Sequence, residues 1–251
     1  MLNALLFFVG SVCCAEQVDV GQLSKVREET PFVFHFEDKD AGVVDEVLIP
    51  MQDVLKRMVK KYQCTIPETI EVKIFPALQT LHDYFGQPEA PEWLIGGKLK
   101  TNEIAFVSPN EQNSYHSRGR ILFVPVHSLI QLQLDNKYPT VPAWLNWGIS
   151  QYESGVFASP QMKKKVRNHL RQKIEKGEIP TLSDLQSDES IFRIQAHTFP
   201  HTMVLFVQQR WGQDVLRSLL ENEGNIEKVL GTSNESFYNE WLAFLKERFY
   251  N

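Results

Sequence analysis

The sequence predicts an α+β fold in which a small N-terminal sheet with helices is followed by a helical C-terminal half. Two observations lead to this prediction. Apolar runs of strand length, bounded by Gly, Pro and other turn residues, occur before residue 117. After that point, apolar positions recur at helical spacing over longer segments. We therefore expect one domain over residues 31–251, with an α+β part at 31–117 and a helical part at 118–251.

The first fifteen residues differ in composition from the rest of the chain. They carry no charged side chain, are rich in Leu and Phe, and end in small residues at Ala15. An apolar run this short is typical of a secretory signal peptide, whereas a membrane-spanning helix needs about 20 residues. We predict cleavage after Ala15, a secreted or periplasmic location and no transmembrane span in the mature chain. A lipoprotein is the weaker alternative, because residues 11–14 fit a lipobox poorly.

After cleavage, residues 16–30 are polar and are expected to form a spacer. Cys64 would be the single remaining thiol, so it has no partner for an intrachain disulfide. We expect it to be a small buried apolar side chain rather than a nucleophile.

Alternating and helical patterns predict the elements of the α+β part. Phe32, Phe34 and Phe36 alternate with other residues as in a strand. A helix is expected over residues 43–62, where Pro50 should kink or split it. Further strands are expected at 69–75, 93–98 and 103–107, with a second helix beginning near Pro76.

Helical spacing predicts the elements after residue 117. The expected helices cover 118–134, 144–153, 162–175, 198–211, 215–220 and 237–249. Pro125 leaves two possibilities for the first of them. Either it kinks the helix, or residues 121–124 are extended and Pro125 opens the helix at its first position.

The charge balance argues against a nucleic-acid-binding protein. The net charge is −5, from 26 Lys and Arg against 31 Asp and Glu, whereas such proteins usually carry a basic surplus. One basic run, Lys163 to Lys165 followed by Arg167, Arg171 and Lys173, lies on a polar helical pattern. We expect a solvated helix face there, with a phosphate or lipid-headgroup patch as the alternative.

The stretch from 120 to 155 reads RILFVPVHSLIQLQLDNKYPTVPAWLNWGISQYESG. It resembles the peptidase-MA-like branch of the gluzincin zinc metallopeptidases. In that family one helix carries HExxH, in which two His side chains at i and i+4 hold Zn²⁺ and the Glu is the general base. A following helix carries W-L-x-E-G-x-A-x-Y, whose Glu is the third ligand.

The likeness extends over most of residues 65–250, because further segments similar to the family occur in order at 74–76, 85–86, 90–93, 206–212, 225–231 and 237–244. The last three segments are similar to the closing helices of the family. The resemblance implies a zincin-like motif helix. It also implies that the strand at 102–109 lies along the substrate cleft.

The functional atoms of the motif are largely replaced. His127 matches the first His, but Ser128 stands where the general base is expected and Gln131 where the second His is expected. Trp147 stands at the third-ligand position, and an indole offers no lone pair to a metal. A catalytic zinc site needs three protein ligands. The resemblance therefore implies that the zinc site is lost, so we expect no metal, no cofactor and no catalytic residue.

Each of these positions also has a structural interpretation. His127 is expected to be a satisfied core histidine, and Gln131 could bond to it across one helical turn. Trp147 would fill the volume that metal and water vacate. With Trp144 and Tyr152, Trp147 lines the relic cleft that we take as the candidate binding site.

Other candidate groups are weaker. His197 and His201 have i, i+4 spacing, but Pro200 lies between them. His116 precedes the motif, and a centre built from Glu153, Asp135 and these histidines has no recognised pattern. We expect an exported, non-catalytic metallopeptidase-like protein (a pseudopeptidase) that binds a peptide or protein partner or has a structural role in the envelope. The alternative is a hydrolase that uses a rearranged or non-zinc centre.

Overall fold

The computed structural model describes residues 23–111 and 116–250, which fall into two compact units. The described residues up to Pro139 form the sheet unit, and those from Thr140 onward form the helical unit. The predicted signal peptide lies outside the described residues. The division follows Pro139 rather than residue 117, because the first long helix of the predicted helical part packs with the sheet.

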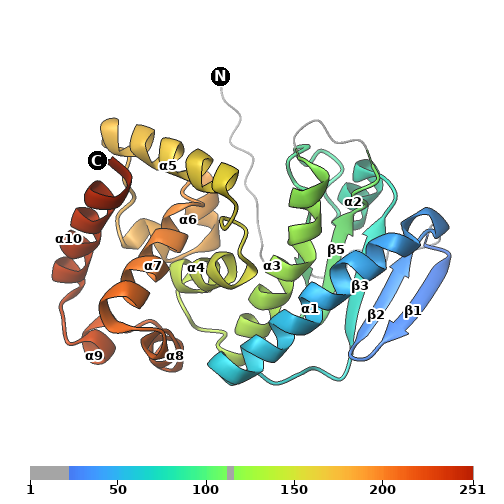
Figure 1. Ribbon diagram of the computed structural model, residues 1–251, viewed down its shortest axis with the longest axis horizontal. Coiled ribbons are helices and arrows are strands. Elements are labelled where there is room, and N and C mark those ends of the chain that lie inside the picture. Colours follow the sequence, from blue (N-terminus) through green and yellow to red (C-terminus); the bar gives the residue numbers. More distant parts are fainter. Residues whose placement is uncertain (1–22, 112–115, 251) are drawn as a thin grey trace. The chain divides into compact units, whose positions relative to one another are not determined.

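The sheet unit is built on five described strands (Figure 1). They are β1 (Lys25–Glu29), β2 (Phe32–Phe36), β3 (Ile70–Phe75), β4 (Gly96–Leu99) and β5 (Glu103–Val107). Their order is β1-β2-β3-β5-β4, in which β2, β3 and β5 are parallel and the two edge strands are antiparallel to their neighbours. This mixed sheet, followed by a helical C-terminal half, confirms the predicted α+β class.

Strand β1 lies inside the segment predicted to be a spacer, so that part of the prediction is wrong. Its sequence KVREE lacks apolar alternation because it is an edge strand with one strand partner, β2. Charged residues suit such a position, since they discourage pairing with another chain.

Helices α1 (Ala41–Tyr62) and α3 (Arg118–Lys137) lie side by side over one face of the sheet (Figure 1). The core between them includes Phe34, Val72 and Ile104, which are fully buried. Helix α2 (Leu78–Tyr84) covers the opposite face, since Tyr84 reaches Phe75, Lys73 and Glu103 of that face.

Both helices that contain an internal proline are continuous. Pro50 lies within α1 and Pro125 within α3, so neither helix is split, and the extended segment considered at residues 121–124 does not form. Each proline removes one backbone N–H donor. The packing of the two helices against the sheet and each other outweighs that loss.

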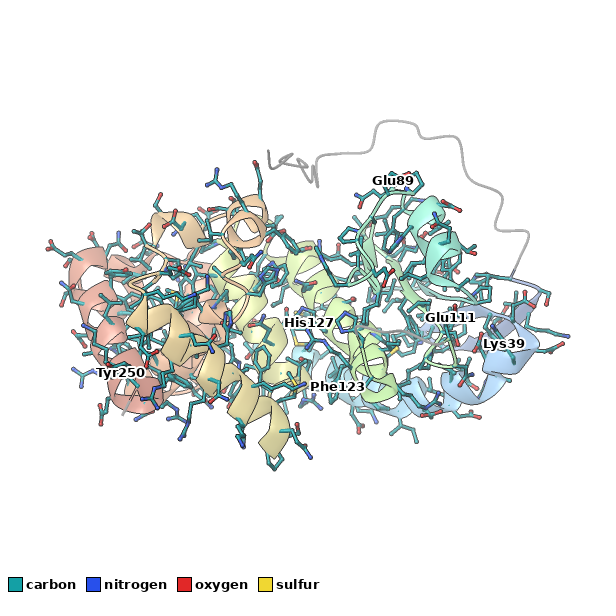
Figure 2. The ribbon with its side chains drawn as sticks, turned by 90° about the horizontal axis from the view of Figure 1, so that it is seen from above. Lys39, Glu89, Glu111, Phe123, His127 and Tyr250 are labelled. Carbon is teal, nitrogen blue, oxygen red and sulfur yellow. The ribbon has the colours of Figure 1, made fainter. Side chains whose placement is uncertain are left out.

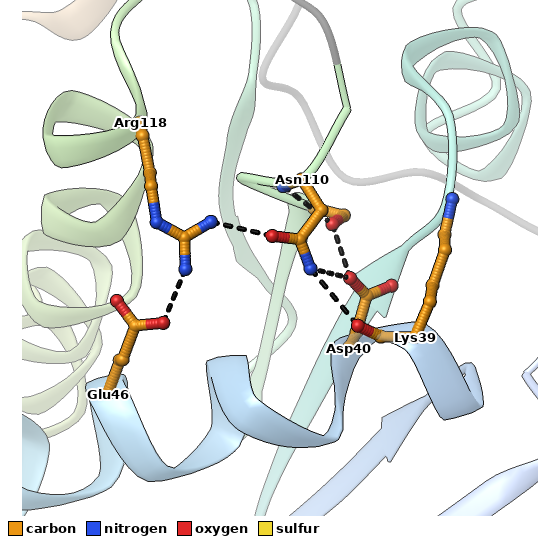
Figure 3. A network of polar contacts seen from close by, with 6 residues as sticks. Lys39, Asp40, Glu46, Asn110 and Arg118 are labelled. Carbon is orange, nitrogen blue, oxygen red and sulfur yellow. Dashed lines mark hydrogen bonds and ion pairs between the residues drawn. The ribbon is translucent and has the colours of Figure 1, made fainter.

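A polar network links the ends of three elements of the sheet unit (Figure 3). Asp40, fully buried at the start of α1, accepts hydrogen bonds from Ser108 Oγ (2.5 Å) and Asn110 Nδ2 (2.9 Å) beyond the end of β5. Asn110 Oδ1 in turn accepts from Arg118 (2.6 Å), the first residue of α3, and Arg118 pairs with Glu46 of α1. The network therefore sets where α3 begins.

A second polar cluster lies on the sheet face under α2. Lys73 Nζ lies 3.3 Å from the buried Glu103 carboxylate and donates to the Tyr84 hydroxyl, which itself donates to Glu103. Burial and the hydrogen bond to Glu103 raise the pKa of Tyr84 above its usual value. A tyrosine shifted in this direction stays neutral, so the cluster is suited to holding α2 rather than to proton transfer.

The helical unit contains the remaining described helices (Figure 1). They are α4 (Ala143–Ser154), α5 (Pro160–Glu175), α6 (Asp188–Arg193), α7 (Phe199–Trp211), α8 (Asp214–Glu221), α9 (Ile226–Leu230) and α10 (Asn234–Leu245), followed by the short turn η3 (Lys246–Tyr250). Helical spacing predicted neither of the short helices α6 and α9, because neither is long enough to show a helical period. For α9, the resemblance at residues 225–231 had implied one of the closing helices.

Helices α4 and α7 pack more closely than any other pair in this unit. A Cβ atom at Gly148 of α4 would lie 2.4 Å from the carbonyl oxygen of Pro200 and 2.5 Å from Val204. Only glycine permits this approach. Aromatic residues fill the surrounding core, where Trp241 donates to Thr202 Oγ1 (3.1 Å) and packs edge-on against Phe199.

No helix in the described part of the chain has both the length and the apolar character needed to cross a membrane.

Candidate functional site

The four positions of the relic motif are divided between the two units. His127, Ser128 and Gln131 lie on α3 of the sheet unit, and Trp147 lies on α4 of the helical unit.

On α3, the motif positions carry small or neutral polar side chains. Ser128 and Gln131 are buried, whereas His127 is half-buried. Figure 2 shows His127 and Phe123, one turn earlier, projecting from α3; Phe123 is 40% exposed. A serine hydroxyl does not take a proton from water at neutral pH, and a carboxamide is a poor zinc ligand. The hydrogen bond suggested between Gln131 and His127 stays a prediction.

Edge strand β4 packs against α3 within the sheet unit. Asp135 of α3 forms an ion pair with Lys98 of β4, so this carboxylate holds the edge strand. Just before β4, Trp93 is 42% exposed, and its carbonyl oxygen lies 3.0 Å from His116 Nε2. Burial lowers the pKa of His116. His116 and Asp135 thus each contact the β4 region.

The strand that was expected to border the cleft is an inner strand. Every residue of β5 is buried, and the strand has β3 on one side and β4 on the other. The implication that residues 102–109 line a cleft is therefore wrong for this sheet. Strand β4 occupies the edge instead.

On α4, Trp147 is held by three contacts within the helical unit. Its indole N–H donates to Asp188 Oδ1 of α6 at 2.7 Å. Its ring packs edge-to-face against Phe192 (5.1 Å between centroids) and His197 (5.8 Å), and these two rings also pack edge-to-face with each other. The third-ligand position therefore belongs to an aromatic cluster.

The other two predicted binding residues have different environments. Trp144 is fully buried and packs near Phe237, so the prediction that it lines a cleft is wrong; its side chain is part of the core. Tyr152 is half-buried, and its hydroxyl accepts a hydrogen bond from Gln208. Tyr152 thus keeps a packing role on α4.

His197 and His201 do not share a helix face. Helix α7 begins at Phe199, so His197 lies before the helix, where its carbonyl accepts from Gln151 (2.7 Å). The His201 ring packs instead against Phe157 (4.9 Å) and Tyr152 (6.4 Å). Burial, with a smaller effect of Arg248, lowers the pKa of His201 to about 4. The spacing in sequence was thus misleading, because Pro200 marks a helix start.

The remaining candidate side chains are buried. Glu153 lies on α4, and Cys64 is a free, buried thiol, as predicted. Burial raises the pKa of Cys64 to about 12, which disfavours the nucleophilic thiolate. Among the described residues, no group of three or more His, Cys, Asp or Glu side chains is arranged to hold a metal ion.

Two features of these surroundings were missed from the sequence. Asp188 and Phe192, the partners of Trp147, lie on a short helix with no periodic signal. The Asp40 network joins residues that are about seventy positions apart in the chain. No local pattern reports such contacts.

No protein-family model matches the chain, and no curated protein matches it.

Proposed function

We propose that the chain is an exported, metallopeptidase-like protein that has lost zinc hydrolysis and binds an extended peptide segment of a partner protein. The observation that carries the proposal is the environment of Trp147. This residue stands where the resemblance implies a carboxylate ligand, and its only polar atom donates to Asp188. An indole nitrogen has no lone pair with which to ligate a metal ion.

The α3 positions support the same conclusion. Ser128 and Gln131 are buried neutral side chains that do not fit a zinc ion, so His127 alone keeps a ligating atom of the motif. A catalytic zinc site needs three protein ligands, so the proposed function includes no hydrolysis through a metal.

Edge strand β4 provides the backbone groups to which a peptide would bind. Ile95 O accepts from Val107 N at 3.0 Å, so the backbone groups of alternate residues, 95, 97 and 99, pair with β5. In an antiparallel ladder the intervening Gly96 and Lys98 then direct their N–H and C=O groups away from β5. Such an edge can accept an added strand from a partner.

The two edges of the sheet differ in a way that favours β4 as the binding edge. Every residue of β1 except Val26 is charged, whereas β4 reads GGKL and carries one charge. The exposed Trp93 and Phe123 of the same unit provide apolar surface for side chains of a partner.

Metal analysis of the purified protein tests the loss of zinc chemistry. We expect no stoichiometric zinc and no chelator-sensitive peptide hydrolysis. The combined variant Ser128→Glu and Gln131→His, which restores an HExxH pattern within α3 and is checked for folding by circular dichroism, serves as the matched gain-of-ligand control. Stoichiometric zinc with chelator-sensitive hydrolysis in the unmodified protein would sink the proposal.

Enzyme activity without zinc is the alternative. If the unmodified protein shows chelator-insensitive hydrolysis, and His127→Ala abolishes it without changing thermal stability, a rearranged centre is the correct interpretation.

Peptide selection followed by edge variants tests the binding role. Peptides selected from a random library should lose binding to Lys98→Pro, which removes an outward N–H of β4. Lys98→Gln is the control, because it loses the same ion pair to Asp135 but keeps the backbone donor. Equal binding to both variants would exclude β4 as the docking edge.

A further inference from the structure

Helix α5 carries a concentration of positive charge that the proposed function does not use. Its sequence PQMKKKVRNHLRQKIE contains six Lys and Arg residues and one carboxylate, Glu175. The chain as a whole is acidic, with a net charge of −5. Helix α5 is therefore strongly basic, although the chain as a whole has a net negative charge.

Four of these cations have no ionic partner among residues 23–111 and 116–250. Arg171 pairs with Glu175 at 3.0 Å and Lys173 with Glu178 at 2.8 Å. No such pair forms within the described residues at the exposed positions Lys163, Lys164, Lys165 and Arg167. Like charges at i, i+4, such as Lys163 and Arg167, weaken a helix. The arrangement costs stability unless the cations meet an anionic partner.

The helical unit holds α5 so that the four cations face solvent. Val166 and Leu170 are buried on the inner face, and Ser159 caps the first turn by accepting from Met162 N. The C-terminal turn η3 packs beside α5, where the Arg171 guanidinium lies 5.8 Å from the centroid of the exposed Tyr250 ring. The basic surface is therefore presented by a packed helix.

We propose that the outer face of α5 docks the protein on an anionic lipid bilayer. Three of the four unpaired cations are lysines, whose compact, strongly hydrated charges suit a diffuse layer of headgroups. A site that binds a single phosphate more often uses the planar guanidinium group of arginine, which forms two parallel hydrogen bonds. Single-stranded nucleic acid is bound along a groove with successive stacking rings, whereas α5 is one convex helix with Tyr250 as its exposed aromatic neighbour.

Vesicle co-sedimentation tests the proposal on the full-length protein. We expect binding to vesicles made of equal parts phosphatidylglycerol and phosphatidylcholine, and none to phosphatidylcholine alone. Each cation near an anionic surface strengthens binding roughly five-fold at low salt, so Lys164→Gln combined with Arg167→Gln should weaken it roughly 30-fold. Added salt should weaken binding further, because it screens exposed charges.

A charge-matched variant in the sheet unit provides the control. Lys56→Gln combined with Lys60→Gln removes two exposed cations at i, i+4 on α1 and should leave vesicle binding unchanged. All four substituted side chains are exposed, so circular dichroism should report folded protein in both variants. Equal loss in both variants, equal binding to neutral vesicles, or tighter α5-dependent binding to a DNA oligonucleotide would each overturn the proposal.

Discussion

Helices α3 and α4 carry the motif positions that the sequence comparison singled out, and their polar and small residues have different environments. On α4, Trp147 bonds to Asp188 and Gly148 permits the close approach of α7. Gln151 Nε2 bonds to His197 O, although its buried Oε1 lacks a partner in the described structure. On α3, Gln133 is buried with both amide atoms lacking a hydrogen-bond partner in the described structure. Trp147 and Gly148 of α4 thus contribute to the packing of the helical unit, whereas Gln133 of α3 lowers the stability of the sheet unit.

Trp147 has contacts that make it structural, since its indole N–H donates to Asp188 and its ring packs against Phe192 and His197. A buried polar side chain that lacks a partner retains a desolvation cost of roughly 1–3 kcal/mol.

The largest expected effect is at Gly148. Gly148→Ala places a Cβ against the backbone of α7, so we expect the helical unit to lose about 3 kcal/mol of unfolding free energy. Urea unfolding followed by tryptophan fluorescence reports this unit well, because all the tryptophans except Trp93 lie in it. The matched control is Gly119→Ala on α3, where a Cβ meets no atom within 4 Å. A comparable loss at Gly119 would break the comparison.

A loss of stability of intermediate size is expected at low pH. It is caused by His201 of α7, the helix that packs against α4. Its folded-state pKa is lowered to about 4 by burial, so between pH 6.5 and 4 the unfolded chain takes up a proton that the folded protein does not. The contribution of neutral His201 to the free energy of unfolding is therefore complete above pH 6.5, and it is lost as the pH falls toward 4. We expect a loss on the order of 2 kcal/mol.

Urea unfolding at a series of pH values checks this prediction. His201→Phe should flatten the pH dependence between 6.5 and 4, because the neutral ring cannot titrate. If the variant keeps the full slope, other groups cause the acid sensitivity.

The smallest effects are expected when a buried glutamine is replaced by methionine, once on α3 and once on α4. Gln133→Met on α3 removes a buried amide without a partner and should stabilise the protein by about 1 kcal/mol. Gln151→Met on α4 removes the 2.7 Å hydrogen bond to His197 O together with a buried Oε1 that lacks a partner in the described structure. The lost hydrogen bond opposes the relief of the unpaired oxygen, so we expect a net destabilisation of no more than about 1 kcal/mol. Calorimetric melting of the two variants measures the difference, and effects of the same sign would contradict the contrast between α3 and α4.

Local patterns predicted elements whose signal is contained in their own residues. The alternation of Phe32, Phe34 and Phe36 predicted β2, and Glu103–Val107 was predicted with its observed bounds. Helical spacing located α1, α4 and α7 to within a few residues. Where the signal lay outside the segment, local patterns failed, as for β1 and for the short helices α6 and α9.

The candidate site was predictable only in its chemistry. The residue types at positions 127, 128, 131 and 147 led to the expectation that no zinc ion binds, since lone pairs and charges belong to the side chains themselves, and this stays a prediction. Their surroundings were not predictable. Trp144 and Trp147 lie three positions apart in the same helix, yet one is core and the other donates to Asp188.

The sequence by itself determined the α+β class and the positions of the long helices, because periodicity is a local property. The tertiary structure alone decided that β4 is the edge strand, that helices run unbroken through Pro50 and Pro125, and that Asp40 meets Asn110. These outcomes depend on contacts between residues far apart in the chain. Burial and strand pairing are settled only when such partners come together.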